Sequence, residues 1–311
     1  MSDGSRSTDI LVIGAGPAGL SAAIWARDLG LRCTVIDARP EPGGQLNSIF
    51  SPIRNYPGIE QIEGPRLAND MMLQARRAGA DLIFGEAVVS IRAPELAVLT
   101  ASGSVLNTKA IVAATGVRRR RLCVPGESEY LGRGILDSGA KRAGELGGSR
   151  VTIIGGGDAA IENAVLLGRA GAIVTVIHRG AEFSARDEFL NPAERLASVT
   201  LLRESNVLRI LGDDRVTSVE VAGADGLPVK IDTNAVLIRI GWEPNSDLLR
   251  EHVRLDERGY AITDKVGRTD VPGIYAVGDV TCREAPTIVT AAGAGAAAAK
   301  AIYSDHFTPG S

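Results

Sequence analysis

Two glycine-rich stretches of this chain share one pattern, and each has the residue types that bind the pyrophosphate of a dinucleotide. Ile13-Gly-Ala-Gly-Pro-Ala-Gly19 and Ile154-Gly-Gly-Gly-Asp-Ala-Ala160 both follow an apolar run, and they align without a gap. In such a turn the first glycine permits a tight bend, and the second lets the backbone approach the pyrophosphate. The helix that follows offers free N–H groups and a positive dipole end to the phosphates. Two such turns predict two bound dinucleotides, and hence a protein that moves electrons between them.

The first turn lies in a predicted βαβ unit. We expect a buried strand over 9–13, a helix over 17–29 and a second strand over 32–36, with Gly19 allowing the helix to pack closely on the strand. The second strand ends at Asp37, where a carboxylate can hydrogen-bond an adenosine ribose. The first unit is therefore predicted to bind an adenine dinucleotide.

The second turn differs from the first at the position that contacts the ribose. Its strands are predicted over 150–154 and 173–177, and the residue that matches Asp37 is His178, followed by Arg179. An acid favours a free 2′-hydroxyl, whereas basic residues accommodate a 2′-phosphate. The second unit is therefore expected to bind NADPH, with NADH as the alternative. Nearby Arg186 could assist, although a solvated arginine is the simpler interpretation.

Segments at both ends of the chain favour FAD as the first ligand. Gly43-Gly-Gln-Leu46 is a loop with an amide side chain, and Thr115-Gly116 follows a predicted strand over 110–113. Near the C-terminus, Gly278-Asp279 follows another strand, and an alanine-rich helix is predicted from about Thr287 to Tyr303. The N-terminus of that helix could stabilise negative charge on a reduced flavin.

The NAD(P) unit must then be inserted within the FAD domain. We predict an FAD domain from residues 1–118 and 246–311, and an NAD(P) domain from residues 119–245. The fold class is α/β, with two Rossmann-like domains. Alternation of apolar and polar residues over 87–106 predicts a small antiparallel meander on the first domain. Residues 199–240 are expected to hold a similar meander, which gives each domain three layers, ββα.

The composition excludes several other classes of protein. The chain has 311 residues, enough for two domains that each bury a core, and its net charge of −3 gives no reason to expect nucleic-acid binding. It has no apolar run long enough to span a membrane, and its first residues are polar rather than signal-like, so we expect a cytoplasmic protein. Cys33, Cys123 and Cys282 are scattered, as are the three histidines, so neither a disulfide framework nor a metal site is predicted.

With these motifs the chain resembles the low-molecular-weight thioredoxin reductases of the pyridine nucleotide–disulfide oxidoreductase superfamily, over nearly its full length. The resemblance implies that Gln45 and Asn55 approach the flavin ring, that Asp279 binds the ribityl chain and that Glu162 lies near the nicotinamide. It also implies a homodimer whose NADPH domain swivels between two electron-transfer geometries. The motifs that carry the resemblance are Gly14-Ala-Gly-Pro-Ala-Gly19, Gly43-Gly-Gln-Leu46, Asn55-Tyr-Pro-Gly58, Thr115-Gly116, Gly132-Arg-Gly134, Gly155-Gly-Gly-Asp158, His178-Arg179 and Gly278-Asp-Val280.

One part of the family pattern is missing. The family carries Cys-x-x-Cys-Asp soon after Gly-Arg-Gly, whereas here Ser138 and Lys141 stand at the cysteine positions and Arg142 at that of the acid. A disulfide reductase of this type needs a thiolate to exchange with its substrate and a second thiol to resolve the mixed disulfide. Ordinary thioredoxin reduction is therefore rejected, and a single-thiol route through Cys282 is kept as a minor alternative.

Two smaller departures concern the cofactor contacts. Gly180 replaces a second arginine that the family has after His178-Arg179, which weakens the expectation of NADPH. The family's Arg-Gln-Ala before the last helix is Ala285-Pro286-Thr287 here, so the local contacts with the flavin are left open.

The leading hypothesis is an FAD-dependent oxidoreductase without a catalytic disulfide, which takes electrons from NADPH and passes them to an external acceptor such as ferredoxin or flavodoxin. The arginine run 118–121, with Lys141 and Arg142, could dock an acidic electron-carrier protein, although a solvated charge run is the simpler interpretation. Against this hypothesis, thioredoxin-reductase-like ferredoxin reductases usually carry a longer C-terminal extension, and this chain stops at Ser311.

Three alternatives remain open. The first is a flavin oxidase or dehydrogenase acting on a small molecule, with Lys141 or His306 as an acid or base. The second is a bacillithiol-type disulfide reductase, although such enzymes usually have a cysteine where this chain has Pro17-Ala18. The third is a non-catalytic flavin-binding protein, against which the retention of both dinucleotide turns argues.

Hydride transfer between nicotinamide and flavin needs mainly stacking and orientation, so no catalytic acid or base is named. The residues predicted to bind the cofactors are Gly14, Gly16, Pro17, Ala18, Gly19, Asp37, Gly44, Gln45, Leu46, Asn55, Thr115, Gly116, Gly155, Gly157, Asp158, Ala159, Glu162, His178, Arg179, Gly278, Asp279, Pro286 and Thr287.

Overall fold

The computed structural model of the chain describes residues 6–49, 51–223, 226–282 and 284–308. The chain forms two compact units, one of Met1–Arg118 with Glu243–Ser311 and the other of Arg119–Trp242. It passes from one to the other through β9 (Val117–Arg119) and β17 (Trp242–Pro244), which pair with each other. Each unit is built on a parallel sheet flanked by helices, which confirms the predicted α/β fold class.

The first unit has a central sheet of five parallel strands in the order β18-β8-β2-β3-β4. Ile10, Leu11 and Val12 of its middle strand are buried, as expected where both faces of a parallel sheet are covered. The five strands are β2 (Ile10–Ile13), β3 (Cys33–Asp37), β4 (Asp81–Phe84), β8 (Ala110–Ala113) and β18 (Ile274–Ala276).

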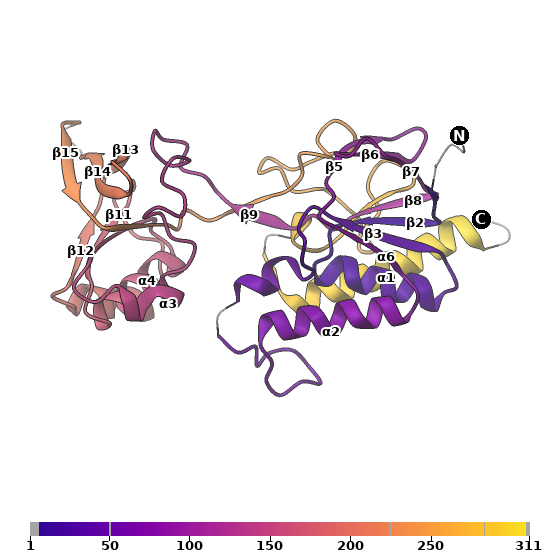
Figure 1. Ribbon diagram of the computed structural model, residues 1–311, viewed down its shortest axis with the longest axis horizontal. Helices are drawn as coiled ribbons and strands as arrows, with labels where there is room; N and C mark the ends of the chain where they lie inside the picture. The colour runs from indigo at the N-terminus through magenta and orange to yellow at the C-terminus, as the bar shows by residue number, and fades with distance from the viewer. Residues whose placement is uncertain (1–5, 50, 224–225, 283, 309–311) are drawn as a thin grey trace. The chain divides into compact units, whose positions relative to one another are not determined.

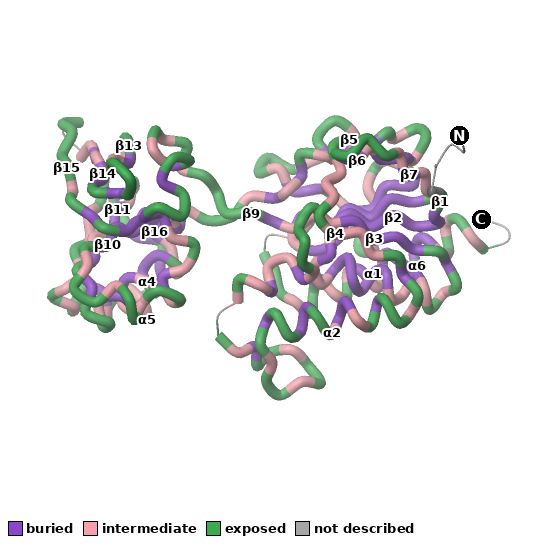
Figure 2. The backbone as a smooth tube through the Cα atoms, viewed as in Figure 1, coloured by how far each residue is buried: buried purple, intermediate pink, exposed green. Residues whose placement is uncertain are grey.

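Helices and a small antiparallel sheet cover the two faces of this sheet (Figure 1). One apolar cluster packs the sheet against the helices, and a second packs it against the antiparallel strands. The unit therefore has three layers, and the buried parallel sheet is the middle one (Figure 2). The helices are α1 (Pro17–Asp28), α2 (Gly64–Arg77) and α6 (Ile288–Phe307), and the strands of the meander are β5 (Val88–Arg92), β6 (Ala97–Thr100) and β7 (Val105–Asn107), with β1 (Arg6–Ser7) at its edge.

The last helix is longer than the sequence predicts. The predicted end is near Tyr303, but α6 continues to Phe307. Its final turn is held by tertiary bonds, because the Asp305 carboxylate accepts hydrogen bonds from Arg268 at 2.6 Å and from the hydroxyl of Tyr275 at 2.6 Å. The bond from Arg268 above all lowers the pKa of Asp305 to about 2, against the opposing effect of burial.

The second unit repeats the plan with four parallel strands in the order β12-β11-β10-β16. The expected meander over 199–240 is shorter than predicted, because the first and last strands of that range join the parallel sheet and only three form the antiparallel layer. The parallel strands are β10 (Arg150–Ile154), β11 (Ile173–Ile177), β12 (Val199–Leu202) and β16 (Ala235–Ile238); the meander is β13 (Asn206–Gly212), β14 (Val216–Ala222) and β15 (Pro228–Asp232).

Helices cover the other face of the second sheet. They are α3 (Gly139–Arg142), the short 3-10 helix η2 (Ala143–Glu145), α4 (Asp158–Arg169) and α5 (Asp187–Arg195). In the part of the chain that the structure describes, no helix has both the length and the apolar character needed to cross a lipid bilayer.

Small residues let α1 and α6 pack with their backbones almost in contact. A Cβ at Gly295 would lie 2.0 Å from the carbonyl oxygen of Ala18, so the position has no space for a larger residue. The hydroxyl of Ser21 donates a hydrogen bond of 2.7 Å to the carbonyl of Ala292 across the same contact. The alanine-rich composition of α6 therefore serves close packing on the first helix.

Gly295→Ala and Gly293→Ala should change stability in opposite directions. The first substitution forces two helix backbones apart and should lower the free energy of unfolding by about 1–3 kcal/mol. At Gly293, an exposed position, a Cβ meets nothing within 4 Å. There the change should raise stability by roughly 0.5–1 kcal/mol through helix propensity. Thermal unfolding of both variants followed by circular dichroism checks this; equal shifts would contradict the packing argument.

Candidate functional site

The glycine turn of the first unit requires glycine for steric reasons. Gly14 has φ +108°, and a Cβ there would lie 2.3 Å from the carbonyl oxygen of Ala114, which directly follows the neighbouring strand β8. A Cβ at Gly19 would lie 1.9 Å from the Gly14 oxygen, so helix and turn are in direct backbone contact. At Gly16 a Cβ meets nothing within 4 Å. The turn is thus open at the residue that precedes α1, where a phosphate group can approach the helix N-terminus.

Asp37 is bonded to the turn itself. One carboxylate oxygen accepts the N–H of Ala15 at 2.7 Å, and the other accepts the N–H of Arg39 at 2.8 Å. The sequence predicted a contact with ribose and missed this structural role. Each oxygen keeps a second lone pair, so the carboxylate can still accept a ligand hydroxyl while it orders the glycine turn.

Two further predicted residues meet although they lie far apart in the sequence. Gln45, in the short 3-10 helix η1 (Gly44–Ser48), donates a hydrogen bond of 3.1 Å to Asp279, in η3 (Gly278–Val280). Burial raises the pKa of Asp279, and the bond from Gln45 opposes that shift. A Cβ at Gly44 would lie 3.4 Å from Cα of Gly16, so this loop also borders the glycine turn. The structure thus brings three predicted segments together.

The remaining predicted residues of the first unit have local partners. Thr115 and Asn245 exchange two hydrogen bonds, of 2.7 and 2.8 Å, which close the turn after β8; sequence analysis missed the role of Asn245. Thr287, which follows Pro286, caps α6 and shares a reciprocal pair of bonds with Thr290. The structure thus shows a capping role for Thr287, and its contribution to flavin binding stays a prediction.

Other predicted residues of the first unit have fewer polar contacts. Asn55 is exposed, and no hydrogen bond in the described part of the chain joins it to Gln45 or Asp279. Leu46 is buried among the helices of the unit.

The glycine turn of the second unit repeats the same steric requirement. Gly155 has φ +145°, and a Cβ there would lie 2.1 Å from the carbonyl oxygen of Arg239, which follows the neighbouring strand β16. Gly157 precedes α4 and is nearly open, with its nearest neighbour, the hydroxyl of Ser184, at 3.7 Å. Of the other predicted residues on this helix, Ala159 and Glu162 are exposed.

His178 packs on the turn rather than standing free beside it. A Cβ at Gly156 would lie 2.3 Å from Nδ1 of the imidazole, so the middle glycine is required as well. Nε2 lies 2.9 Å from the carbonyl oxygen of Glu182, and the ring stacks on Phe183 with centroids 5.1 Å apart. Sequence analysis assigned no role to Gly156, although the run of three glycines could have indicated that this position also requires glycine.

The basic candidates of this unit differ in how they are paired. Arg186 bonds to Asp158 at 2.7 Å and to Glu188 at 2.6 Å, and its bonds with Asp158 lower the pKa of that acid and raise the pKa of Arg186. Asp158 and Arg186 therefore form an ion pair at the start of α4. Arg179 is exposed and has no ion pair among the described residues, so it is the basic side chain available to a ligand.

The segment at the expected cysteine positions forms a helix start. Ser138 accepts a hydrogen bond of 3.4 Å from the N–H of Lys141 and caps α3, while Arg142 pairs with Glu145 at 2.8 Å. Of the thiols, Cys33 is buried in β3, and burial raises its pKa to about 12. Cys282 is partly exposed. Among the described residues no cluster of histidine, cysteine and acidic side chains could hold a metal ion.

Known proteins resemble this chain in both sequence and fold. A sequence model of the family described as pyridine nucleotide-disulphide oxidoreductase matches residues 8–296. Thioredoxin reductase of Listeria innocua is 33% identical over 297 residues, which cover 95% of this chain and 92% of the relative. Thioredoxin reductase of Bacillus subtilis is 33% identical over 298 residues, which cover 94% of this chain and 93% of that protein. The crystal structure of Lactococcus lactis thioredoxin reductase has a TM-score of 0.81 at 32% identity and covers 96% of this chain and 98% of its own.

Gly16→Ala should fold normally but bind FAD more weakly. The structure leaves space for the methyl group, whereas a pyrophosphate approaching the same backbone would meet it. We expect the affinity for FAD to fall by roughly tenfold or more, equivalent to the loss of one charge-assisted hydrogen bond. Titration of the apoprotein with FAD measures this, with Gly144→Ala, another open glycine, as the control. Unchanged affinity in Gly16→Ala would exclude the turn as the phosphate site.

Proposed function

Because the chain belongs to the pyridine nucleotide-disulphide oxidoreductase family, we propose that it is an FAD-dependent oxidoreductase that takes electrons from NADPH and uses no catalytic disulfide. When bound, FAD supplies the redox chemistry, and the protein supplies binding, orientation and electrostatics. The observation that carries the proposal is the pair of glycine turns, each followed by a helix and each closed against the carbonyl that ends a neighbouring strand. We further propose that the first unit binds FAD, the second binds NADPH and the protein is a homodimer.

The residues of the first unit fit FAD. Gly16 leaves space in front of the α1 N-terminus, and Asp37 stands at the end of the second strand with lone pairs left for a ribose. Asp279 is a partly buried carboxylate that accepts a hydrogen bond from Gln45. An acid in this environment is stabilised by further hydroxyl donors, which the ribityl chain of a flavin carries.

The residues of the second unit fit a nicotinamide dinucleotide. Gly157 leaves the α4 N-terminus accessible to a pyrophosphate. Arg179 supplies an exposed guanidinium one residue after the position that contacts the ribose. Since Arg186 is already shared by two carboxylates, Arg179 is the residue to which we assign the 2′-phosphate.

The acceptor is proposed to be external and not a protein disulfide. Ser138 and Lys141 cannot exchange with a disulfide, and Ser138 is engaged as the cap of α3. This departure from the expected cysteine pattern separates the proposal from thioredoxin reduction. An electron carrier such as ferredoxin or flavodoxin is our first candidate.

The arginine run 118–121 gives limited support to docking of an acidic carrier. Arg118 pairs with Glu243 at 2.7 Å, and Arg120 donates a hydrogen bond of 3.0 Å to the carbonyl of Trp242. Arg121 bonds to Ser128 and lies 3.8 Å from Glu127. Because these guanidinium groups have internal partners, a small-molecule acceptor is our second candidate.

Anaerobic mixing of the FAD-loaded protein with NADPH should bleach the flavin absorbance, and NADH should do so more slowly. Addition of oxidised ferredoxin or flavodoxin over a range of salt concentrations should then restore the colour. Recovery with neither carrier, but with small quinone or disulfide acceptors, would favour the second candidate. Flavin that no nucleotide bleaches would overturn the proposed donor, and flavin that no reductant bleaches would indicate a non-catalytic protein.

Arg179→Gln should weaken NADPH binding selectively. Loss of one charged hydrogen bond to the 2′-phosphate should raise KM for NADPH by roughly tenfold or more and leave KM for NADH nearly unchanged. Arg169→Gln removes another exposed arginine of the same unit and serves as the control. Equal effects on the two nucleotides would refute the assignment of Arg179.

A further inference from the structure

A buried arginine lies at the carboxyl edge of the second sheet. Arg239 directly follows β16, and only 7% of its surface is exposed. Its two terminal nitrogens donate hydrogen bonds of 2.8 Å to the main-chain carbonyls of Ile238 and Asp137. Those bonds orient the guanidinium but leave its charge uncompensated, because carbonyl groups are neutral.

No carboxylate within the described ranges lies at ion-pair distance from Arg239, whereas other arginines such as Arg118, Arg186 and Arg268 pair with acids. Asp137 stabilises the charge only from farther away. Burial and a neighbouring positive charge, that of Arg119, lower the pKa of Arg239 to about 10. A buried charge without a close counter-ion is costly, and an anionic ligand would offset that cost.

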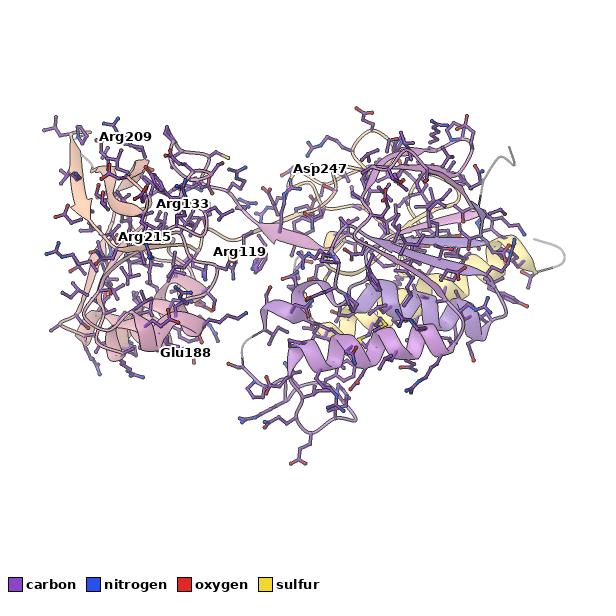
Figure 3. The ribbon with its side chains drawn as sticks, viewed as in Figure 1. Arg119, Arg133, Glu188, Arg209, Arg215 and Asp247 are labelled. Atoms are coloured by element: carbon purple, nitrogen blue, oxygen red, sulfur yellow. The ribbon has the colours of Figure 1, made fainter. Side chains whose placement is uncertain are left out.

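The neighbouring cation, Arg119, stands at the end of β9 (Figure 3). Its guanidinium lies over the indole ring of Trp242, 4.5 Å from the centroid. No carboxylate in the described chain lies at ion-pair distance from it. Burial lowers the pKa of Arg119, and the more distant charge of Asp137 opposes that shift. The backbone N–H of Arg120 donates a hydrogen bond of 3.0 Å to the carbonyl of Gly241, so the two arginines stand on neighbouring segments. Two positive charges in one region favour the binding of an anion there.

The location of the pair is one where ligands bind in α/β proteins. In the order β12-β11-β10-β16 the chain extends to opposite sides of β10, so the gap between β10 and β16 is the point at which the strand order reverses. Ligands of open parallel sheets bind at the carboxyl ends of the strands at such a point. Arg239 borders it directly, since its carbonyl oxygen lies against Gly155 of the second glycine turn.

We propose that Arg119 and Arg239 form an oxyanion-binding site at this edge of the second unit. Arg119, which reaches solvent, would contact the oxyanion, and Arg239 would supply fixed positive potential beneath it. The oxyanion is a phosphate on the nicotinamide half of a dinucleotide or the carboxylate of a small acceptor molecule. The first source rests on the proposed NADPH function, and the second is independent of it.

Trp242 provides a direct reporter of the site. The chain has two tryptophans, and Trp25→Phe leaves Trp242 as the single one, with its ring under the Arg119 guanidinium. An anion that binds Arg119 should change the fluorescence of this indole. We would titrate the oxidised, FAD-loaded Trp25→Phe protein with nicotinamide mononucleotide, with malonate and with 2′,5′-ADP, against sodium chloride at matched ionic strength.

Arg119→Met and Arg239→Met in this background should each raise the dissociation constant of the responding probe by roughly tenfold or more. Arg215→Met, in the turn between β13 and β14 of the same unit, should leave it within about twofold. A response to nicotinamide mononucleotide alone identifies the phosphate source, and a response to malonate alone identifies the carboxylate source. Affinity for 2′,5′-ADP, which lacks the nicotinamide half, should be unchanged in both variants.

Three results would overturn the site. The first is that no probe changes the fluorescence more than chloride does, and the second is that Arg119→Met binds the probe as tightly as its parent. The third is that Arg119→Met weakens the binding of 2′,5′-ADP as much as it weakens the binding of the probe. If Arg239→Met does not fold, the exposed Arg119 position decides alone. Because the titration needs no electron transfer, a protein whose flavin NADPH does not bleach would still show the site. The failure of the proposed function and the failure of this inference are therefore distinguishable.

Discussion

The close approach of a glycine backbone to a strand-ending carbonyl determines the architecture of both units. In the first unit Gly14 lies against Ala114 after β8, and in the second Gly155 lies against Arg239 after β16. Any side chain at either glycine would overlap that carbonyl, so the turn could not remain beside the neighbouring strand. The position of the following helix depends on the turn, and so does the open space before its N-terminus. Sheet, helix and candidate phosphate site are thus fixed by one steric constraint that occurs twice.

The two units order the glycine turn through different interactions. Asp37 of the first unit accepts the N–H of Ala15, so an acid at the end of the second strand stabilises the turn through a charged hydrogen bond. In the second unit the matching residue, His178, packs its ring on Gly156. The residue at the position that we predict to discriminate between nucleotides therefore also holds the glycine turn, so a substitution at Asp37 or His178 should alter the turn as well.

Positive charge in the second unit is distributed unevenly. Arg186 shares its charge with two carboxylates, whereas Arg239 and Arg119 have none within ion-pair distance in the described chain. Arg239 also holds the carbonyl of Asp137, next to the segment where Ser138 and Lys141 stand at the expected cysteine positions. This segment and the buried cation without a close counter-ion thus occur in the same part of the fold. Their proximity links the proposed oxyanion site to the proposed change of acceptor.

The two glycine turns, the strands that flank them and the α/β class could be predicted from the amino-acid sequence, because steric requirements for glycine and the apolar periodicity of buried strands are local. Tertiary structure alone decided the contacts between distant segments: Gln45 with Asp279, Thr115 with Asn245, and the last turn of α6 with Arg268. It also decided that Arg186 is paired and that Arg239 is buried without a counter-ion among the described residues. Charge balance depends on which side chains meet after folding, and spacing along the chain does not specify it.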